Sequence, residues 1–446
     1  MLWFLVPIVI GLAGGGCLPT RKVGDPPDGG NKDEKDAGNR LDGDGPPVSQ
    51  DMFVSDADGN SPDPDMFPPD AGVPGPPVLL HPAQDATLQP TLPPNPLGAF
   101  LAWEDGFLPA GAEVSHYVLC HTTEGADVID GPACPNSQEV VSRYALIDTI
   151  TAATDYYWKV QSCFKETGGD CTPFSEIRTF HGGDESMLPL AKWDFNGNLN
   201  DSGPNGLHGE SPVNAGFASP AFVANGDICS GEAVSGLLEG ERAACFDDSD
   251  GTYDYVQLTQ HIDRLGFGSV DDYSVEIRAR RDAAAGGSVN LFRMAGDYTP
   301  RPSDPVLTVS LTSEDEAPEY ANRVFVERSG IQLYSVEELP LGAFAHTAVV
   351  HNGEVGESTL QLFTDGVLQD GDSSDYPFAA ADFNYTTVHA VPGCPETCLL
   401  SANVLLDHIA VYPRALSPEE VVNNLCAFGV LTGTVDGLAS CLNSAE

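Results

Sequence analysis

Basic residues are scarce in this sequence of 446 residues. Lysine and arginine together number 20, against 66 aspartates and glutamates, which gives a formal net charge of -46 at pH 7. A surface of this sign repels phosphate backbones, so the composition excludes nucleic acid as a partner. Most of the acidity is expected to form a solvated surface that keeps the chain soluble.

Catalytic motifs are also missing. The chain has no Gly-x-Ser-x-Gly segment, which excludes the nucleophile elbow of serine hydrolases, and its ten histidines include no His-x-x-x-His pair. No strand-like segment carries the two or three alternating carboxylates that glycoside hydrolases use. The densest acidic group, residues 314–319, contains a proline and lacks alternating apolar residues, so we expect a solvated loop there. We therefore expect no enzymatic activity and no catalytic residues.

An apolar run near the start of the sequence leads into a cysteine. The run covers residues 2–13, and three glycines separate it from Cys17. It is shorter than a comfortable membrane span, which needs about 20 apolar residues, and it has the length of a signal-peptide core. The segment resembles the signal peptide and lipobox of bacterial lipoproteins. The resemblance implies a signal peptide over 1–16, lipid on Cys17 and anchoring to the outer membrane of the cell envelope, on either its periplasmic or its surface face. An ordinary signal peptide or an uncleaved anchor is the alternative.

The other ten cysteines fall as near neighbours along the chain. In an exported protein this spacing predicts local disulfides, with sequential pairing as the simplest arrangement. The predicted pairs are Cys120 with Cys134, Cys163 with Cys171, Cys229 with Cys245, Cys394 with Cys398, and Cys426 with Cys441. Zinc is the rival interpretation for Cys394 and Cys398, although no second ligand pair at finger spacing follows.

Residues 17–78 have the composition of a disordered linker. Of the 60 residues from 18 to 77, 33 are proline, glycine or aspartate. Such a segment buries too little apolar surface to offset the entropy of ordering it, so we expect an extended spacer that follows the lipidated cysteine.

Residues 79–182 are expected to form a small all-β domain. Short apolar runs alternate with proline, glycine and asparagine clusters. The strands expected from this pattern cover 99–103, 115–119 and 156–160. The segment 150–160 resembles the F strand of fibronectin type III domains, and 174–180 resembles their last strand. The resemblance implies that Tyr156 is a tyrosine-corner residue, whose hydroxyl bonds the backbone upstream, and that Trp103 is the core tryptophan of an earlier strand.

Residues 188–426 also consist of short alternating strands, followed by a C-terminal tail over 427–446 tied by a disulfide. Asp365 and Gly366 predict the tight turn of a hairpin within 359–369. Ser417, Pro418 and Glu420 predict the start of a helix, with Ser417 as the cap and Glu420 closing a capping box.

Five segments of this region, in order, resemble the laminin-G-like, or concanavalin A-like, jellyroll family. They are 193–209, 245–256, 273–280, 344–350 with the hairpin that follows, and 406–420. The resemblance implies a two-sheet antiparallel sandwich. Two positions depart from the family pattern, because Arg278 stands where an aromatic residue is usual and Phe344 replaces a tryptophan. Glu276 precedes Arg278, and a salt bridge to the nearby arginines is its expected role.

The same resemblance implies a structural calcium site where the first and last strands meet. Calcium takes several hard oxygen ligands, including backbone carbonyls. The residues implied as ligands are Asp194, Asn196, Gly197, Asp201 and Asp407. The alternative is that Asp201 and Asn205 make only turn hydrogen bonds.

Taken together, the fold class is all-β and the expected function is non-catalytic: a lipoprotein that displays a lectin-like jellyroll for glycan or protein binding and adhesion. The alternatives are a structural envelope spacer and a divergent glycoside hydrolase. Glycan-binding faces usually present aromatic side chains. Trp193 is expected in the core, and the aromatic candidates on strand edges or loops are Tyr253, Tyr255, Tyr298 and Tyr385.

Overall fold

The structure of the protein is a computed structural model. It describes residues 73–91, 98–130, 134, 136–165, 170–210, 217–237, 240–247, 253–254, 256–259, 272–282, 289–295, 305–312, 320–328, 331–353, 359–373, 385–388 and 404–432. Cys17 and the predicted linker up to residue 72 lie outside this range. No helix in these ranges is long and apolar enough to cross a membrane.

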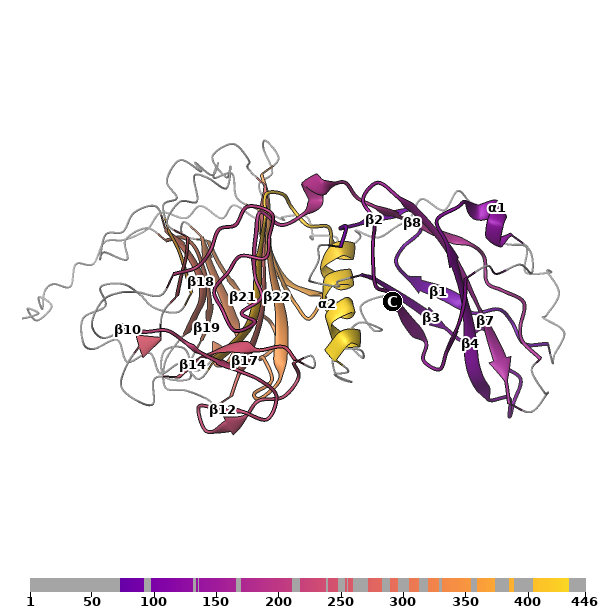
Figure 1. The fold of residues 1–446 in the computed structure, drawn as a ribbon, viewed down its shortest axis with the longest axis horizontal. Helices are drawn as coiled ribbons and strands as arrows, with labels where there is room; N and C mark the ends of the chain where they lie inside the picture. The colour runs from indigo at the N-terminus through magenta and orange to yellow at the C-terminus, as the bar shows by residue number, and fades with distance from the viewer. Residues whose placement is uncertain are drawn as a thin grey trace, which may run out of the picture. The chain divides into compact units, whose positions relative to one another are not determined.

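The first β-sandwich is built from eight strands and one short helix (Figure 1). The elements are β1 (Val78–His81), β2 (Ala86–Leu88), β3 (Ala99–Glu104), β4 (Val114–Thr122), α1 (Ala126–Ile129), β5 (Ser137–Val140), β6 (Tyr144–Ile147), β7 (Asp155–Phe164) and β8 (Arg178–Gly182). One sheet has the order β1-β3-β6 and the other the order β2-β8-β7-β4-β5. All these pairings are antiparallel except β2 with β8.

The two sheets enclose a core that includes Trp103, Trp158 and Phe180. The Tyr156 hydroxyl donates a hydrogen bond to the Thr149 carbonyl at 3.2 Å, which is the upstream bond expected of a tyrosine corner. The assignment of this sandwich to the fibronectin type III family itself stays a prediction.

The last strand of this sandwich lies later than the sequence pattern indicates. A strand was expected over 174–180, but β8 begins only at Arg178. The preceding residues run beside β7 through irregular bonds: Thr172 N donates to the Ser162 carbonyl, and Val160 N donates to the Ser175 hydroxyl. Because a side-chain oxygen replaces a backbone carbonyl there, no regular ladder forms.

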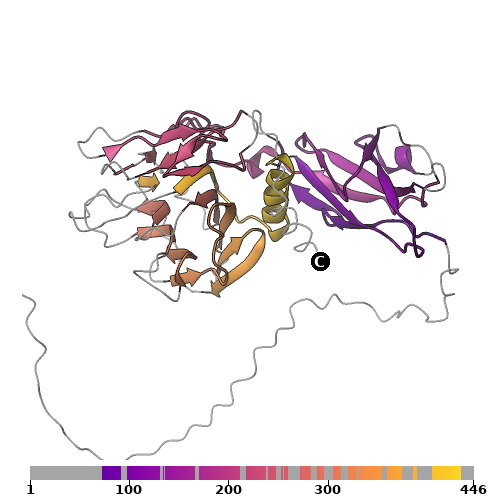
Figure 2. The same cartoon turned by 90° about the horizontal axis from the view of Figure 1, so that it is seen from below.

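The second β-sandwich follows a short 3₁₀ turn at Glu185–Met187. Its strands are β9 (Ala191–Trp193), β10 (Phe217–Ala218), β11 (Ala221–Val223), β12 (Ile228–Cys229), β13 (Glu232–Ala233), β14 (Ala243–Phe246), β15 (Tyr253–Asp254), β16 (Val256–Thr259), β17 (Tyr273–Arg281), β18 (Val289–Ala295), β19 (Pro305–Leu311), β20 (Val324–Arg328), β21 (Ile331–Tyr334), β22 (Phe344–Asn352), β23 (Thr359–Thr364), β24 (Val367–Ser373), β25 (Tyr385–Val388) and β26 (Val404–Tyr412). Helix α2 (Pro418–Thr432) follows the last strand and is the yellow coil in Figure 2.

Two large sheets form this sandwich. An eight-stranded sheet has the order β11-β14-β26-β17-β22-β23-β24, with β9 also paired to β26, and a six-stranded sheet has the order β16-β25-β18-β19-β20-β21. Alternate residues of both sheets meet in one core that includes Trp193, Ile277 and Val309. The expected all-β architecture with a jellyroll sandwich is therefore confirmed, and Trp193 is in the core.

Two local sequence signals form the elements they predict. Asp365 and Gly366 join β23 to β24 with φ values of 47° and 77°, which is the left-handed conformation that a tight hairpin turn needs. At the start of α2, Glu420 N donates to the Ser417 hydroxyl at 3.2 Å, and Ser417 N donates to the Glu420 carboxylate at 3.0 Å. This is a complete capping box. The helix continues to Thr432, so the boundary drawn at residue 427 falls inside it.

The outer face of the eight-stranded sheet is covered by two elements. Helix α2 packs Val421 against Ala348, Ala410 and Tyr412. At the other side, the β12–β13 hairpin and the residues that follow it bring Val234 and Leu237 against β14 and β26.

Candidate functional site

The outer face of the six-stranded sheet carries two rows of chemically varied side chains. Strands β18 to β21 send one set of residues into the core, so the alternate set points to the opposite face. The strand register places Asn290 opposite Ser310, Ser310 opposite Phe325, and Phe325 opposite Tyr334. We call these four residues the amide–aromatic row.

A second row lies beside the first. Arg293 is opposite Thr308, Thr308 opposite Glu327, and Glu327 opposite Gln332. We call these four residues the charged row. A bulge between Asn290 and Phe292 brings Arg293 onto the same face as Asn290, because it shifts the alternation of β18 by one residue.

The amide–aromatic row ends in a group of packed rings. The Phe325 and Tyr334 ring centroids lie 4.8 Å apart, and Tyr320 stacks on Tyr334 with centroids 4.1 Å apart. At the other end of the row, the Ser310 hydroxyl donates to the Asn290 amide oxygen at 2.7 Å. Ser310 and Thr308 are buried, whereas Asn290 and the three rings are partly exposed. The row thus offers the Asn290 amide, held in place by Ser310, at one end and aromatic surface at the other.

These residue types suit a ligand rich in hydroxyl groups. Amide, hydroxyl, guanidinium and carboxylate groups provide both donors and acceptors, and they lie beside aromatic rings that an apolar face can cover. Binding sites commonly combine a few placed polar groups with aromatic surface in this way. Glu327 is the one carboxylate of the two rows, whereas retaining glycoside hydrolysis uses two about 5 Å apart.

The sequence pattern did not point to these aromatic residues. Phe325, Tyr334 and Tyr320 occur in or beside short strands, where a ring is usually part of the core. The period of two along β20 was the available signal, because Val324 and Val326 leave Phe325 on the other face. Of the candidates chosen instead, Tyr253 is in β15 and Tyr385 in β25, and Tyr255 and Tyr298 lie outside the described residues.

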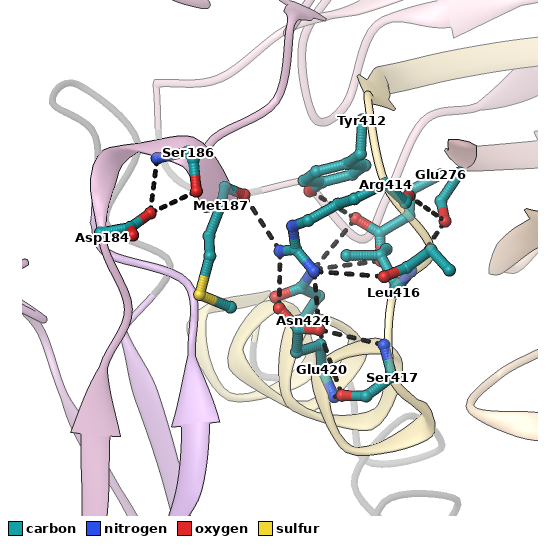
Figure 3. A network of polar contacts seen from close by, with 12 residues as sticks. Asp184, Ser186, Met187, Glu276, Tyr412, Arg414, Leu416, Ser417, Glu420 and Asn424 are labelled. Carbon is teal, nitrogen blue, oxygen red and sulfur yellow. Dashed lines mark hydrogen bonds and ion pairs between the residues drawn. The ribbon is translucent and has the colours of Figure 1, made fainter. Parts of the chain in front are cut away.

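The outer face of the eight-stranded sheet holds buried charges. Glu276, Arg278 and Arg280 follow one another at alternate positions of β17, and all are at most 5% exposed. The prediction that Glu276 forms a salt bridge to the nearby arginines is wrong. Glu276 accepts hydrogen bonds from the Tyr412 hydroxyl at 2.7 Å and from Asn424, at 3.0 and 3.1 Å, as Figure 3 shows. Burial opposes ionisation of Glu276, but His346 and these hydrogen bonds outweigh it, and the pKa of Glu276 lies below its ordinary value.

Arg278 pairs with a carboxylate from the neighbouring strand. Its guanidinium donates to Asp407 at 2.7 Å and to the Gly236 carbonyl at 2.8 Å. Asp407 sits at a bulge of β26, where the register with β17 shifts. Burial raises the pKa of Asp407, but Arg278 and His408 outweigh burial and hold this pKa below its ordinary value.

The residues implied as calcium ligands have other partners. Asp201 is buried and accepts three backbone N–H bonds, from Lys192 at 2.8 Å, Gly203 at 2.7 Å and Leu207 at 2.6 Å. Asp201 therefore stabilises the turn by hydrogen bonds, which is the alternative to calcium binding. Asp194 accepts from the Ser202 hydroxyl at 2.5 Å.

Two further members of the implied set have partners: the Asn196 side chain accepts from Arg242 N at 2.8 Å, and Asp407 pairs with Arg278. Gly197, which would bind through its carbonyl, donates its own N–H to the Phe195 carbonyl. Among the described residues, no group of three or more His, Cys, Asp and Glu side chains is arranged to hold a metal ion. The calcium site stays a prediction.

Three of the predicted disulfides are present. They are Cys120–Cys134, Cys163–Cys171 and Cys229–Cys245. Cys426 is also disulfide-bonded, with a partner outside the described residues. Cys394, Cys398 and Cys441 lie outside them as well, so their pairing stays a prediction.

Comparison with known protein families identifies the fold of the second sandwich. Residues 250–422 match the family model of the concanavalin A-like lectin/glucanases superfamily. This segment is thus a concanavalin A-like jellyroll domain, as the laminin-G-like resemblance implied. No protein of curated function matches the chain.

Several solved structures are similar at low identity. The sialidase carbohydrate-binding module of Ruminococcus gnavus, bound to α2,3-sialyllactose, is 12% identical, with a TM-score of 0.29 over 35% of this chain and 83% of that one. The binding domain of botulinum neurotoxin serotype C1 is 9% identical, with a TM-score of 0.38 over 53% of this chain and 52% of that one. The Trypanosoma rangeli sialidase in complex with sialic acid is 11% identical, with a TM-score of 0.36 over 62% of this chain. The chain spans about half of the neurotoxin domain and 43% of the Trypanosoma sialidase.

Proposed function

We propose that this protein is a non-catalytic, lectin-like binding protein of the cell envelope that holds a glycan on the outer face of the six-stranded sheet. The observation that carries the proposal is the pair of cross-strand rows, in which donors and acceptors lie beside the packed rings of Phe325 and Tyr334. The concanavalin A-like lectin/glucanase family match supports a carbohydrate ligand.

A glycan array with substituted variants tests the proposal. The full chain is applied with calcium and with a chelator, and the bound glycans are then measured again with Phe325→Ala and Tyr334→Ala. Each substitution should weaken binding by about fivefold or more, because a ring at the centre of a contact typically contributes about 1 kcal/mol or more. Phe107→Ala is the matched control, since Phe107 is 51% exposed on the first sandwich.

The outcomes separate the alternatives. Binding that is unchanged by both substitutions would show that the glycan binds elsewhere on the protein. The absence of binding in every condition would favour a structural spacer or a protein ligand for adhesion. Turnover of a polysaccharide that a single carboxylate substitution abolishes would show an enzyme.

We also propose that the protein is exported and anchored by lipid on Cys17. The disulfides of both sandwiches support an oxidising compartment. Mass spectrometry of the N-terminal peptide from the native host tests the anchor. A diacylated or triacylated Cys17 is expected, whereas an intact Met1 or an unmodified Cys17 would refute it.

A further inference from the structure

The middle of helix α2 is buried on every side. Seven consecutive residues, Val421 to Ala427, are each at most 9% exposed. A helix that packs on one neighbour keeps a solvated stripe, whereas a helix buried all round lies between two partners. The sequence of α2 agrees, because apolar residues and two asparagines occupy all positions of its second and third turns.

One partner of α2 is the jellyroll from which it emerges. Val421 packs in the cluster under β22 and β26, and Asn424 donates to the buried Glu276 carboxylate. At its start, Arg414 holds Glu420 with two bonds of 2.8 and 2.6 Å and donates to the Met187 carbonyl at 3.0 Å (Figure 3). These contacts fix the helix against the second sandwich.

The other partner is the outer face of the β1-β3-β6 sheet. A strand with one solvated face alternates apolar and polar residues, but all five residues Ala99–Trp103 of β3 are fully buried. Phe100 and Ala102 point away from the core of the first sandwich and pack with Val422, Leu425 and Cys426 of α2. The helix therefore completes the first sandwich as well.

Polar bonds fix the register of this second contact. Asn423 accepts from Phe100 N at 3.0 Å and donates to the Gly98 carbonyl at 3.3 Å, so it binds the edge of β3 like a neighbouring residue of a sheet. Glu419 accepts from Ala83 N at 2.6 Å and lies 3.1 Å from the His81 ring. Asn423 is only 3% exposed.

We propose that α2 is a core element shared by both sandwiches, so that residues 73–182 and the jellyroll form one obligate unit with a fixed mutual orientation. The interaction surface is the outer face of β1-β3-β6, and the partner it fits is the C-terminal helix of the same chain. The first sandwich then supports the jellyroll in a fixed position and is not a domain that moves independently of it.

Cutting the connection between the sandwiches tests this proposal. A protease site is inserted after Glu185 in the full chain, and the cleaved protein is run on a size-exclusion column. The described disulfides each lie within one half, and a non-reducing denaturing gel confirms that no covalent link joins the halves. After cleavage no linker joins the two halves, and they should still co-elute.

Variants of α2 decide what holds the halves together. Val422→Asp should release them, whereas Val141→Asp, the same change at a position 86% exposed on the first sandwich, should not. Asn423→Ala keeps the apolar contact, removes two hydrogen bonds and should shift dissociation to an at least tenfold higher protein concentration. Near-UV circular dichroism of the released halves shows whether the jellyroll stays folded.

Two results would overturn the proposal: cleaved parent halves that separate at micromolar concentration, or Val422→Asp and Asn423→Ala halves that remain together like the parent. Neither result depends on a ligand, so the test is independent of the proposed glycan binding.

Discussion

The guanidinium carbon of Arg278 lies 4.4 Å from the centre of the Phe344 ring. These are the two positions at which the sequence departs from the laminin-G-like pattern, and they contact each other diagonally across β17 and β22. A cation over an aromatic face is favourable, and more so when it is desolvated. The two departures therefore stabilise each other by direct contact, and Arg278 also reaches Asp407 and the Gly236 carbonyl.

Arg278→Met should lower the free energy of unfolding by about 3–5 kcal/mol, because it leaves the buried Asp407 carboxylate without its cation. Urea unfolding followed by tryptophan fluorescence measures the change. Lys165→Met is the control, since Lys165 pairs with Glu113 at an exposed site and should cost at most about 1 kcal/mol. Adding Asp407→Asn to Arg278→Met should recover part of the loss, and no recovery would contradict the ion-pair explanation.

Acidification should destabilise the jellyroll in two steps. Burial holds the pKa of His408 below its ordinary value of 6.5, although Asp407 opposes this shift. The unfolded chain therefore binds a proton at His408 first, and stability falls as the pH drops below about 6.5, by at most about 1.4 kcal/mol per pH unit. Glu276 and Asp407 have pKa values below their ordinary ones, so the stability they contribute is lost at lower pH, below about 4.

Urea midpoints measured from pH 8 to pH 2 separate these two steps. His408→Gln should flatten the loss between pH 6.5 and pH 5 relative to the parent and leave the acid step in place. An unchanged slope in that variant would assign the upper step to another group, such as His121, whose pKa burial also lowers.

Replacing Cys229 and Cys245 by alanine should lower the free energy of unfolding by about 2–4 kcal/mol, since the bond closes a loop in the unfolded chain. The hairpin that this disulfide anchors, together with the residues that follow it, also supplies the carbonyls that Arg278 and Arg280 bind. The same change at Cys163 and Cys171, which are separated by 8 residues instead of 16, should cost less. Thermal unfolding of both variants ranks the two losses, and the reverse order would show that loop length does not set them.

Ser417→Ala should destabilise the protein by about 1 kcal/mol, because it removes the cap of α2. If α2 is shared, hydrogen exchange should then rise in β3 as well as in β26. Faster exchange confined to the jellyroll would mean that α2 supports one sandwich only.

Local signals in the sequence predicted local structure well. The Asp365–Gly366 turn, the Ser417 capping box and the three disulfides each depend on residues close together in the chain. Trp103 was expected in the core from the fibronectin type III resemblance, and Trp193 because a large ring is usually a core residue; both are fully buried.

Contacts between strands were harder to predict. Glu276 was assigned to the arginines of its own strand, but same-face neighbours along a strand lie about 7 Å apart, whereas residues on adjacent strands are closer. Its actual partners, Tyr412 and Asn424, come from β26 and α2. The rows on β18 to β21 were not predicted for the same reason, because the sequence of a single strand does not determine which residues lie opposite it on the neighbouring strand. The unbroken apolar run of residues 99–103 did indicate that both faces of β3 are buried. Nothing in the sequence indicated that α2 is the element that covers the outer face.

The amide–aromatic row has a length as well as a composition. From Asn290 to Tyr334 it crosses three gaps between strands, or about 14 Å. A single sugar cannot touch both the amide and the terminal ring at that span. If the row binds a glycan as proposed, affinity should therefore grow with the number of sugar units in an oligomer until the row is covered and then level off. Such a site would distinguish oligomers by their length more than by any single sugar.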